Sequence, residues 1–197
     1  KQRIERHLNT MNLPPLIGSK FPELAAHWDD CKQLLTPIEA PAHTQLLTEG
    51  DISTTIYIVV SGALRLWQAG ERQEITFQFF FDNEIVSSFE SLYLNQPSDC
   101  SLEALEDSQL LKLSKTDFEL LCQRYPSLEQ SMTRWICQRF ITYRGRMLKQ
   151  LQQSPLERYQ DLLENEPELI ERVPLHEIAS YIGITPVSLS RIRKRLG

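Results

Sequence analysis

The sequence lacks the features that mark membrane proteins and disulfide-rich proteins. Its 197 residues contain no run of about 20 apolar residues, which a membrane-spanning helix needs, and no basic-then-apolar segment of the kind that begins a signal peptide. The four cysteines are scattered, without a CxxC pair or a histidine at zinc-finger spacing, so we expect small buried side chains. The chain begins with Lys1, which suggests a trimmed N-terminus. We expect a soluble, cytoplasmic protein without a membrane partner.

Motifs of common enzyme classes are also missing. The sequence contains no P-loop, no GxSxG nucleophile motif and no paired-carboxylate constellation. His176-Glu177 begins like a zinc-protease motif, but Ser180 occupies the place of the second histidine. Because that motif needs two imidazoles on one helical face, we expect neither a metal site nor an enzyme.

The net charge of -5 hides a basic segment at the end of the chain. Residues 154–184 contain two basic and seven acidic side chains, whereas residues 185–197 contain four basic side chains and no acid. A protein that coats nucleic acid indiscriminately would not have a negative total. The segregated charge instead favours a localised contact with an anionic partner.

Strand-like and helical patterns divide the rest of the chain. From about residue 41 to 113, short apolar runs such as 56–60 and 75–81 are separated by turn residues at regular spacing, which favours an antiparallel barrel or sandwich. Residues 21–35 read as short helices packed on this barrel. No internal repeat appears.

From residue 128 to 151, apolar residues recur every three or four places, which predicts a long amphipathic helix. Its spacing is close to the heptad repeat, and its length exceeds what one small barrel covers, so we expect a homodimer. Packing on its own barrel alone is the alternative. Gly145 suggests bending or close approach. The residues expected at the dimer contact are Met132, Ile136, Phe140, Tyr143 and Met147.

The last residues predict a helix-turn-helix. Ser154-Pro155 reads as the N-cap and first residue of a helix over 156–164, which Asn165-Glu166-Pro167 ends, and two short helices follow. Ala179 is small where these two helices cross, Gly183 forms the turn, and Thr185-Pro186 begins the second. That helix would offer Arg191 to guanine, and its other cations to phosphates. The residues expected to contact DNA are Thr185, Pro186, Val187, Ser188, Ser190, Arg191, Arg193, Lys194 and Arg195.

Nearly the whole chain resembles the Crp/Fnr family of transcription regulators, especially its shorter Bacteroidetes-type members. The resemblance is carried by residues 49–51, 57–62, 125–126, 154–159 and, most specifically, 173–193. It implies an α+β protein that binds double-stranded DNA as a homodimer and contacts RNA polymerase. The implied parts are a cyclic-nucleotide-binding-like β-roll (a jelly roll) over residues 1–126, a dimerisation helix over 127–153 and an all-α helix-turn-helix domain over 154–197.

The effector positions of this family are altered here. Members that bind cyclic nucleotides hold the ribose with a Gly-Glu pair and the phosphate with an Arg-Ser or Arg-Thr pair, and the matching positions are Ser87-Ser88 and Ser98-Asp99. A phosphate facing Asp99 without the arginine would be repelled, so we expect no usual binding of cyclic AMP. A pocket for a different small molecule and a degenerate, ligand-independent loop both remain open; no other cofactor is expected. The expected pocket residues are Ser87, Ser88, Phe89, Glu90, Ser98, Asp99, Arg139, Tyr143 and Arg144.

A second function stays open beside DNA binding. Pro186 and Val187 stand where many family members have polar base-reading residues, and the chain ends at Gly197, before the two-stranded wing of longer members. The alternative is a ligand-binding regulatory module whose C-terminal helices contact protein rather than DNA.

Overall fold

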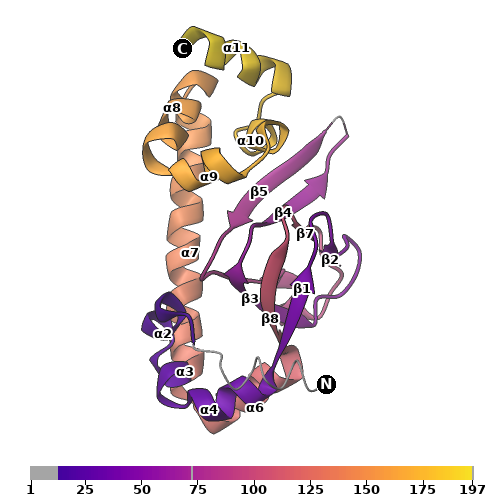
Figure 1. The fold of residues 1–197 in the computed structure, drawn as a ribbon, viewed down its shortest axis with the longest axis vertical. Helices are drawn as coiled ribbons and strands as arrows, with labels where there is room; N and C mark the ends of the chain where they lie inside the picture. Colours follow the sequence, from indigo (N-terminus) through magenta and orange to yellow (C-terminus); the bar gives the residue numbers. More distant parts are fainter. Residues whose placement is uncertain (1–12, 72, 197) are drawn as a thin grey trace.

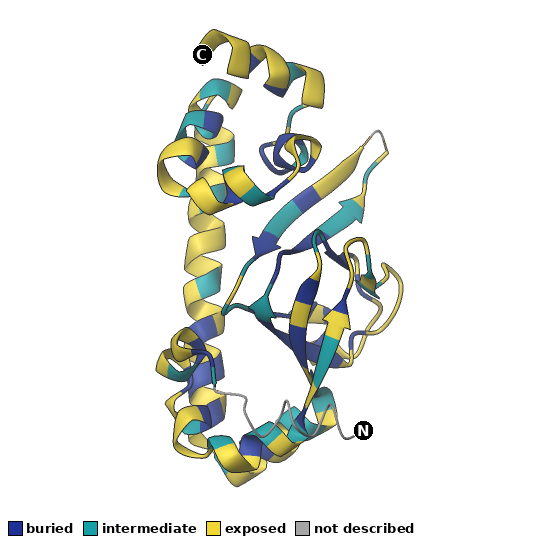
Figure 2. Ribbon diagram, in the orientation of Figure 1, coloured by how far each residue is buried: buried dark blue, intermediate teal, exposed yellow. Residues whose placement is uncertain are grey.

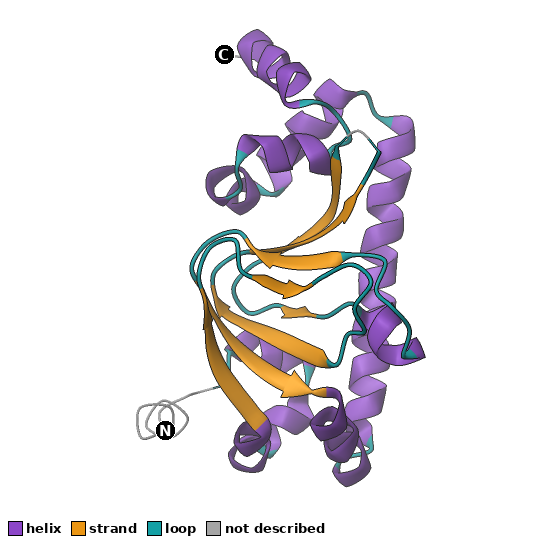
Figure 3. Ribbon diagram, turned by 90° about the vertical axis from the view of Figure 1, so that its right-hand side faces the viewer, coloured by secondary structure: helices purple, strands orange, loops and turns teal. Residues whose placement is uncertain are grey.

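The computed structural model describes residues 13–71 and 73–196. A barrel of two antiparallel sheets lies beside one long helix, and a group of short helices lies around the end of that helix (Figure 1). Seen from the side, the short C-terminal helices rest on one hairpin of the barrel (Figure 3). The predicted α+β architecture, a β-roll followed by a long helix and small helices, is confirmed.

The barrel consists of two four-stranded sheets. All strand pairs are antiparallel, and apolar side chains such as Val59, Leu64 and Leu102 fill the space between the sheets. The first sheet contains, in order, β1 (Leu35–Ala40), β8 (Ser108–Ser114), β3 (Thr55–Ser61) and β6 (Ile85–Val86). The second contains β2 (Gln45–Leu47), β7 (Ser101–Ala104), β4 (Leu64–Ala69) and β5 (Glu74–Phe80).

The first strand begins earlier than the sequence pattern predicts. β1 starts at Leu35, whereas the pattern of short apolar runs predicts strands only from about residue 41. β1 also contains Pro37. Proline has no N–H to donate to a sheet, but among the described strands β1 lies at the edge of its sheet and pairs with β8 alone. Its position at the edge explains why proline is tolerated there.

Short helices cover the first half of the long helix, α7 (Ser127–Gln152). They bury Phe21 against Trp135 of α7, with ring centroids 6.2 Å apart, so the two belong to one core. The helices are α2 (Pro15–Lys20), α3 (Pro22–Ala26), α4 (Trp28–Cys31), the 3-10 turn η1 (Lys32–Leu34), α5 (Phe89–Leu94) and α6 (Lys115–Arg124).

The second half of α7 is exposed (Figure 2). Met132, expected at a dimer contact, instead lies in the core of its own chain and is 9% exposed. α7 continues through Gly145 without interruption, and within this chain a Cβ at Gly145 would meet nothing within 4 Å, so no other described part of the chain approaches it closely. Cys137 is also exposed on α7, which corrects the expectation that the cysteines are buried.

Four helices form the C-terminal part. Ser154 and Glu157 form a capping box before Pro155, as predicted. Pro167 begins an additional helix instead of only ending α8, so three short helices follow, not two. The four are α8 (Pro155–Asn165), α9 (Pro167–Arg172), α10 (Leu175–Tyr181) and α11 (Pro186–Leu196).

Candidate functional site

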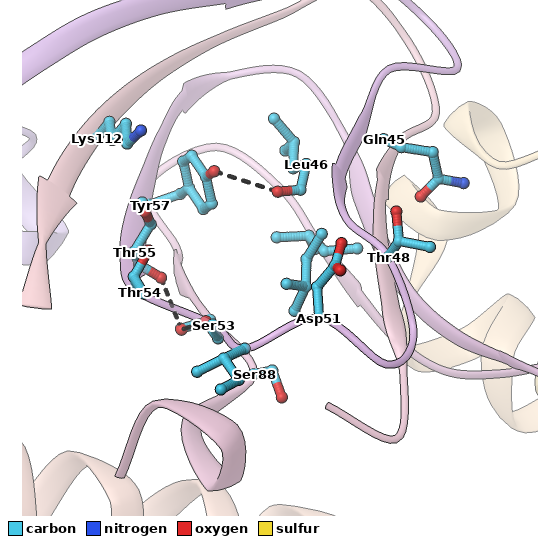
Figure 4. Close-up of a pocket in the computed structure, with 14 residues that line it drawn as sticks. Gln45, Leu46, Thr48, Asp51, Ser53, Thr54, Thr55, Tyr57, Ser88 and Lys112 are labelled. Carbon is cyan, nitrogen blue, oxygen red and sulfur yellow. Dashed lines mark hydrogen bonds between the residues drawn. The ribbon is translucent and has the colours of Figure 1, made fainter. Parts of the chain in front are cut away.

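A cavity of about 490 Å³ opens between the two sheets of the barrel (Figure 4). Hydroxyl groups form much of its wall, and one of them belongs to Ser88, the N-cap residue of α5. We call it the barrel cavity. It is lined by Gln45, Leu46, Leu47, Thr48, Asp51, Ile52, Ser53, Thr54, Thr55, Tyr57, Ser87, Ser88, Leu102 and Lys112.

Hydrogen bonds within the protein hold the serines of the barrel cavity in place. Ser87 Oγ donates to the carbonyl oxygen of Thr55 at 2.8 Å and lies 3.1 Å from Ser53 Oγ. Ser98 Oγ donates to Ser88 Oγ at 2.9 Å from outside the lining. Because a hydroxyl both donates and accepts, these groups suit the hydroxyl and amide groups of a neutral ligand.

The lining of the barrel cavity contains little positive charge that could bind an anion. Its charged residues are Lys112 and Asp51, and none of the lining residues is an arginine. Phosphate recognition commonly uses the bidentate N–H donors of arginine. A cyclic phosphate bound in this cavity would therefore have no guanidinium partner.

A second cavity, of about 300 Å³, lies where β5, α7 and α10 meet. We call it the hinge cavity. Phe79 of β5 and Tyr181 of α10 contact each other there, with ring centroids 4.9 Å apart. Burial raises the pKa of Tyr181, although the charge of Arg146 opposes this shift. The phenol is therefore a neutral part of the wall. The cavity is lined by Lys20, Gln78, Phe79, Phe81, Glu84, Trp135, Gln138, Arg139, Thr142, Tyr143, Arg146, Glu166 and Tyr181.

Arg65 on β4 joins the barrel to α10. It is 4% exposed; its Nε and Nη2 donate to Glu103 at 3.1 and 2.9 Å, and its Nη1 donates to Glu177 of α10. Nη2 also donates to Glu74 at 2.8 Å. Burial alone would lower the pKa of Arg65, but the hydrogen bond to Glu103 and the charges of Glu177 and Glu103 raise it. We call this group the Arg65 network.

Two further contacts fix the C-terminal helices on the barrel. Ser180 of α10 accepts a hydrogen bond from the backbone N–H of Thr76 at 2.8 Å and donates to the carbonyl oxygen of Glu74 at 2.7 Å. Arg172 of α9 pairs with Glu106 and, at 3.2 Å, with Asp82. The start of the helix-turn-helix therefore docks directly on β5.

The turn between α10 and α11 has the predicted geometry. Gly183 has φ +71°, a conformation that favours glycine, and Ala179 is fully buried where the helices meet. Thr185 Oγ1 accepts a hydrogen bond from the backbone N–H of Ser188 at 3.2 Å, which caps α11. Leu189 and Ile192 are buried on the inner side of α11.

The outer side of α11 faces solvent. Val187 is 61% exposed, and Arg191 is exposed on the same helix. Ser188 is only half-buried, and its hydroxyl lies 2.9 Å from that of Thr185, so both hydroxyls already have a partner. The remaining predicted contact residues, Pro186, Ser190, Arg193, Lys194 and Arg195, are all exposed.

Residues 37–125 match the sequence model of the cyclic nucleotide-binding domain. A comparison with curated proteins finds no match. Among solved structures, a catabolite activator protein from Thermus thermophilus is 23% identical, with a TM-score of 0.57 over 93% of this chain and 86% of that chain. The c-di-GMP responsive regulator CLP from Xanthomonas campestris is 18% identical, with a TM-score of 0.72 over 87% and 91%. A protein from Eubacterium rectale, assigned to the Crp/Fnr family of transcriptional regulators, is 19% identical, with a TM-score of 0.70 over 90% and 87%.

The chain has the fold of the Crp/Fnr regulators. The Crp/Fnr fold extends from the barrel through α7 to the C-terminal helices, because each of these matches covers most of both chains. Within the part of the chain that the structure describes, no helix has both the length and the apolar character needed to cross a membrane.

This Crp/Fnr fold divides the nine residues expected in one effector pocket among several places. Ser87 and Ser88 line the barrel cavity, with Ser98 hydrogen-bonded behind them. Arg139 and Tyr143 line the hinge cavity instead of capping the barrel cavity. Phe89 packs against Trp135 in the core, while Glu90, Asp99 and Arg144 are exposed.

Proposed function

We propose that this chain is a sequence-specific DNA-binding transcription regulator that acts as a homodimer. The observation that supports it best is α11, an exposed helix with four basic and no acidic residues, at the end of a Crp/Fnr regulator fold. A major groove accepts one α-helix, and a cationic helix gains affinity by releasing counterions from phosphates. The division into domains 1–126, 127–153 and 154–197 is part of this proposal, as are a cytoplasmic location and contact with RNA polymerase.

Arg191→Ala is expected to weaken binding to a selected operator by about 1–3 kcal/mol while leaving random duplex affinity nearly unchanged. The reason is that Arg191 lies exposed within α11 and can reach a guanine edge, whereas Lys194 is better placed for a phosphate. Fluorescence anisotropy on an operator selected from a random library, and on a scrambled duplex, measures both affinities.

Lys194→Ala is the matched control, because it should weaken operator and scrambled duplex alike. An equal loss on both duplexes for Arg191→Ala would contradict a base-reading role. Titration with salt tests the proposal as a whole, since counterion release predicts affinity that falls steeply with salt. Weak, salt-independent binding to every duplex would favour the alternative, in which α10 and α11 contact a protein.

The exposed half of α7 supports the homodimer. Ile136, Phe140, Tyr143 and Met147 are between 43% and 66% exposed, and Leu151 is 74% exposed. Ile141 and Leu148 widen this apolar face. Large apolar side chains at heptad spacing on a solvated helix are typical of a coiled-coil contact with a second copy.

Met147→Glu is expected to weaken the dimer by about tenfold or more, because it places a carboxylate against its twin in an apolar contact. Sedimentation equilibrium of the full chain measures the dissociation constant. Gln138→Glu, at an exposed position about half a turn away from both Ile136 and Phe140 on the same helix, should change it much less. A wild-type chain that stays monomeric at about 0.1 mM would contradict the dimer.

For the barrel cavity we propose an effector other than cyclic AMP. The supporting observation is a lining of hydroxyl groups with Lys112 and Asp51 as its charged members and no arginine. A cavity of about 490 Å³ is within the size range of small-molecule sites.

A further inference from the structure

We propose that the hinge cavity binds a small aromatic carboxylate. The proposal concerns a site different from the barrel cavity, and binding there does not depend on whether the chain binds DNA. Three features support it: the size and aromatic walls of the cavity, an excess of positive charge, and a partly buried guanidinium with few carboxylate partners.

The walls of the hinge cavity suit one flat ring. Its volume of about 300 Å³ is at the lower end of the range for ligand pockets, so the occupant is small. Phe79 and Phe81 contribute from β5 and the residue after it, Trp135 from α7 and Tyr181 from α10. Aromatic side chains around a ring gain both buried apolar area and edge-to-face contacts.

Positive charge exceeds negative charge around this cavity. Lys20, Arg139 and Arg146 line it, against Glu84 and Glu166. Arg146 Nη1 donates to the carbonyl oxygen of Phe77 at 3.0 Å and has no carboxylate within ion-pair distance among the residues that the structure describes. One more anion would therefore balance the charges.

Within the described part of the chain, Arg139 has only one weak carboxylate partner. Its side chain is 24% exposed, and its guanidinium lies between the rings of Phe80 and Trp135, at 4.9 and 5.1 Å from their centroids. Its ion pair with Glu84 Oε1 is long, at 3.7 Å, and the other oxygen of Glu84, Oε2, accepts a hydrogen bond from the backbone N–H of Phe81 at 2.8 Å.

The pKa directions agree with this geometry. Burial lowers the pKa of Arg139, the charge of Glu84 opposes that shift, and the charge of Arg146 adds to it. Burial raises the pKa of Glu84, because it disfavours the charged form of a carboxyl as it does that of a guanidinium. Both side chains are only partly exposed, so a ligand carboxylate that accepts hydrogen bonds from Arg139 would offset part of the cost of their desolvation.

An occupant of the hinge cavity would contact three parts of the fold at once. Arg146 of α7 stacks on Tyr181 of α10 at 4.6 Å, and both line the cavity beside β5. A ligand that contacts these groups in the docked arrangement stabilises it relative to others. If the proposed DNA-binding function holds, the same ligand would therefore change operator affinity.

Isothermal titration of the full chain without DNA tests the site. The probes are benzoate, phenylacetate and 4-hydroxybenzoate, each compared with its uncharged amide. We expect at least one carboxylate to bind with a Kd of about 1 mM or tighter, and its amide about tenfold more weakly, the difference that one charge-assisted hydrogen bond gives. Arg139→Gln and Arg146→Gln should each weaken the carboxylate by about tenfold.

Arg144→Gln is the matched control, since Arg144 lies on α7 but is exposed and outside the lining. It should leave the titration unchanged. Three results would overturn the proposal: amides that bind as tightly as the acids, unchanged binding by Arg139→Gln, or no binding by any probe at about 10 mM. Circular dichroism checks that each variant folds, and Lys20→Gln replaces Arg139→Gln if that variant does not. Operator binding is measured separately, so failure of this site and failure of the DNA-binding proposal give different results.

Discussion

We expect the free energy of unfolding of an Arg65→Met variant to be about 3–5 kcal/mol lower than that of the wild type. Arg65, Glu103 and Glu177 are 4%, 7% and 4% exposed, so removing the guanidinium leaves two buried carboxylates without their cation. Methionine keeps much of the volume of the side chain, so the loss reports the charge rather than a cavity. Urea denaturation followed by circular dichroism measures the difference.

Arg172→Met is the control for the Arg65 network. Arg172 also joins a C-terminal helix to the barrel, but the side chains of its partners Glu106 and Glu168 are 39% and 54% exposed. Water solvates these carboxylates when the arginine is removed, so we expect a loss of about 1 kcal/mol. A second variant, Arg65→Met with Glu177→Gln, should recover part of the stability of Arg65→Met. A loss below about 1 kcal/mol for Arg65→Met would show that the network contributes no more than a surface ion pair.

The Arg65 network also explains why the docking of the two parts could not be predicted from the sequence. Arg65 lies in an apolar strand run, and Glu177 lies in what reads as the start of a helix-turn-helix, 112 residues later. Neither local pattern contains information about the other. Their contact depends on how α7 and α8 place α10 on β5, which is a property of the whole fold.

Features that depend on neighbouring residues were predicted well. The caps at Ser154 and Thr185 and the turn at Gly183 follow from residue types within four positions of each other. Strand β1 was not predicted because Pro37 argues against a strand, although proline is tolerated at the edge of a sheet. Helix α9 was not predicted because Pro167 was taken as the end of a helix, although proline can also begin one.

The residues of the predicted effector pocket do not all line one cavity. Ser87 and Ser88, which were assigned to the pocket by counting positions along the chain, both line the barrel cavity. Counting positions could not predict which side of β5 the side chains of α7 would contact. Arg139 contacts Phe80 and Trp135, and it therefore lines the hinge cavity. Side chains on a helix of 26 residues point in all directions, so small rotations decide which cavity each one reaches.

A Gly62→Ala variant is expected to lose about 3–5 kcal/mol of unfolding free energy, through backbone strain and overpacking together. Gly62 joins β3 to β4 with φ +118°, and an added Cβ would overlap with Ser108 Oγ and lie 2.7 Å from Ser108 Cα. Rotating the Ser108 hydroxyl away cannot relieve the contact with backbone, so β8 or the turn must shift. Chemical denaturation measures the loss.

Gly50→Ala separates the two causes. Gly50 has φ +93°, so alanine is strained there too, but its Cβ would meet nothing within 4 Å. We expect a loss of about 1–2 kcal/mol, from the backbone conformation alone. Equal losses for the two variants would contradict the contact with Ser108, whereas a larger loss for Gly62→Ala gives the cost of separating β8 from the β3–β4 turn.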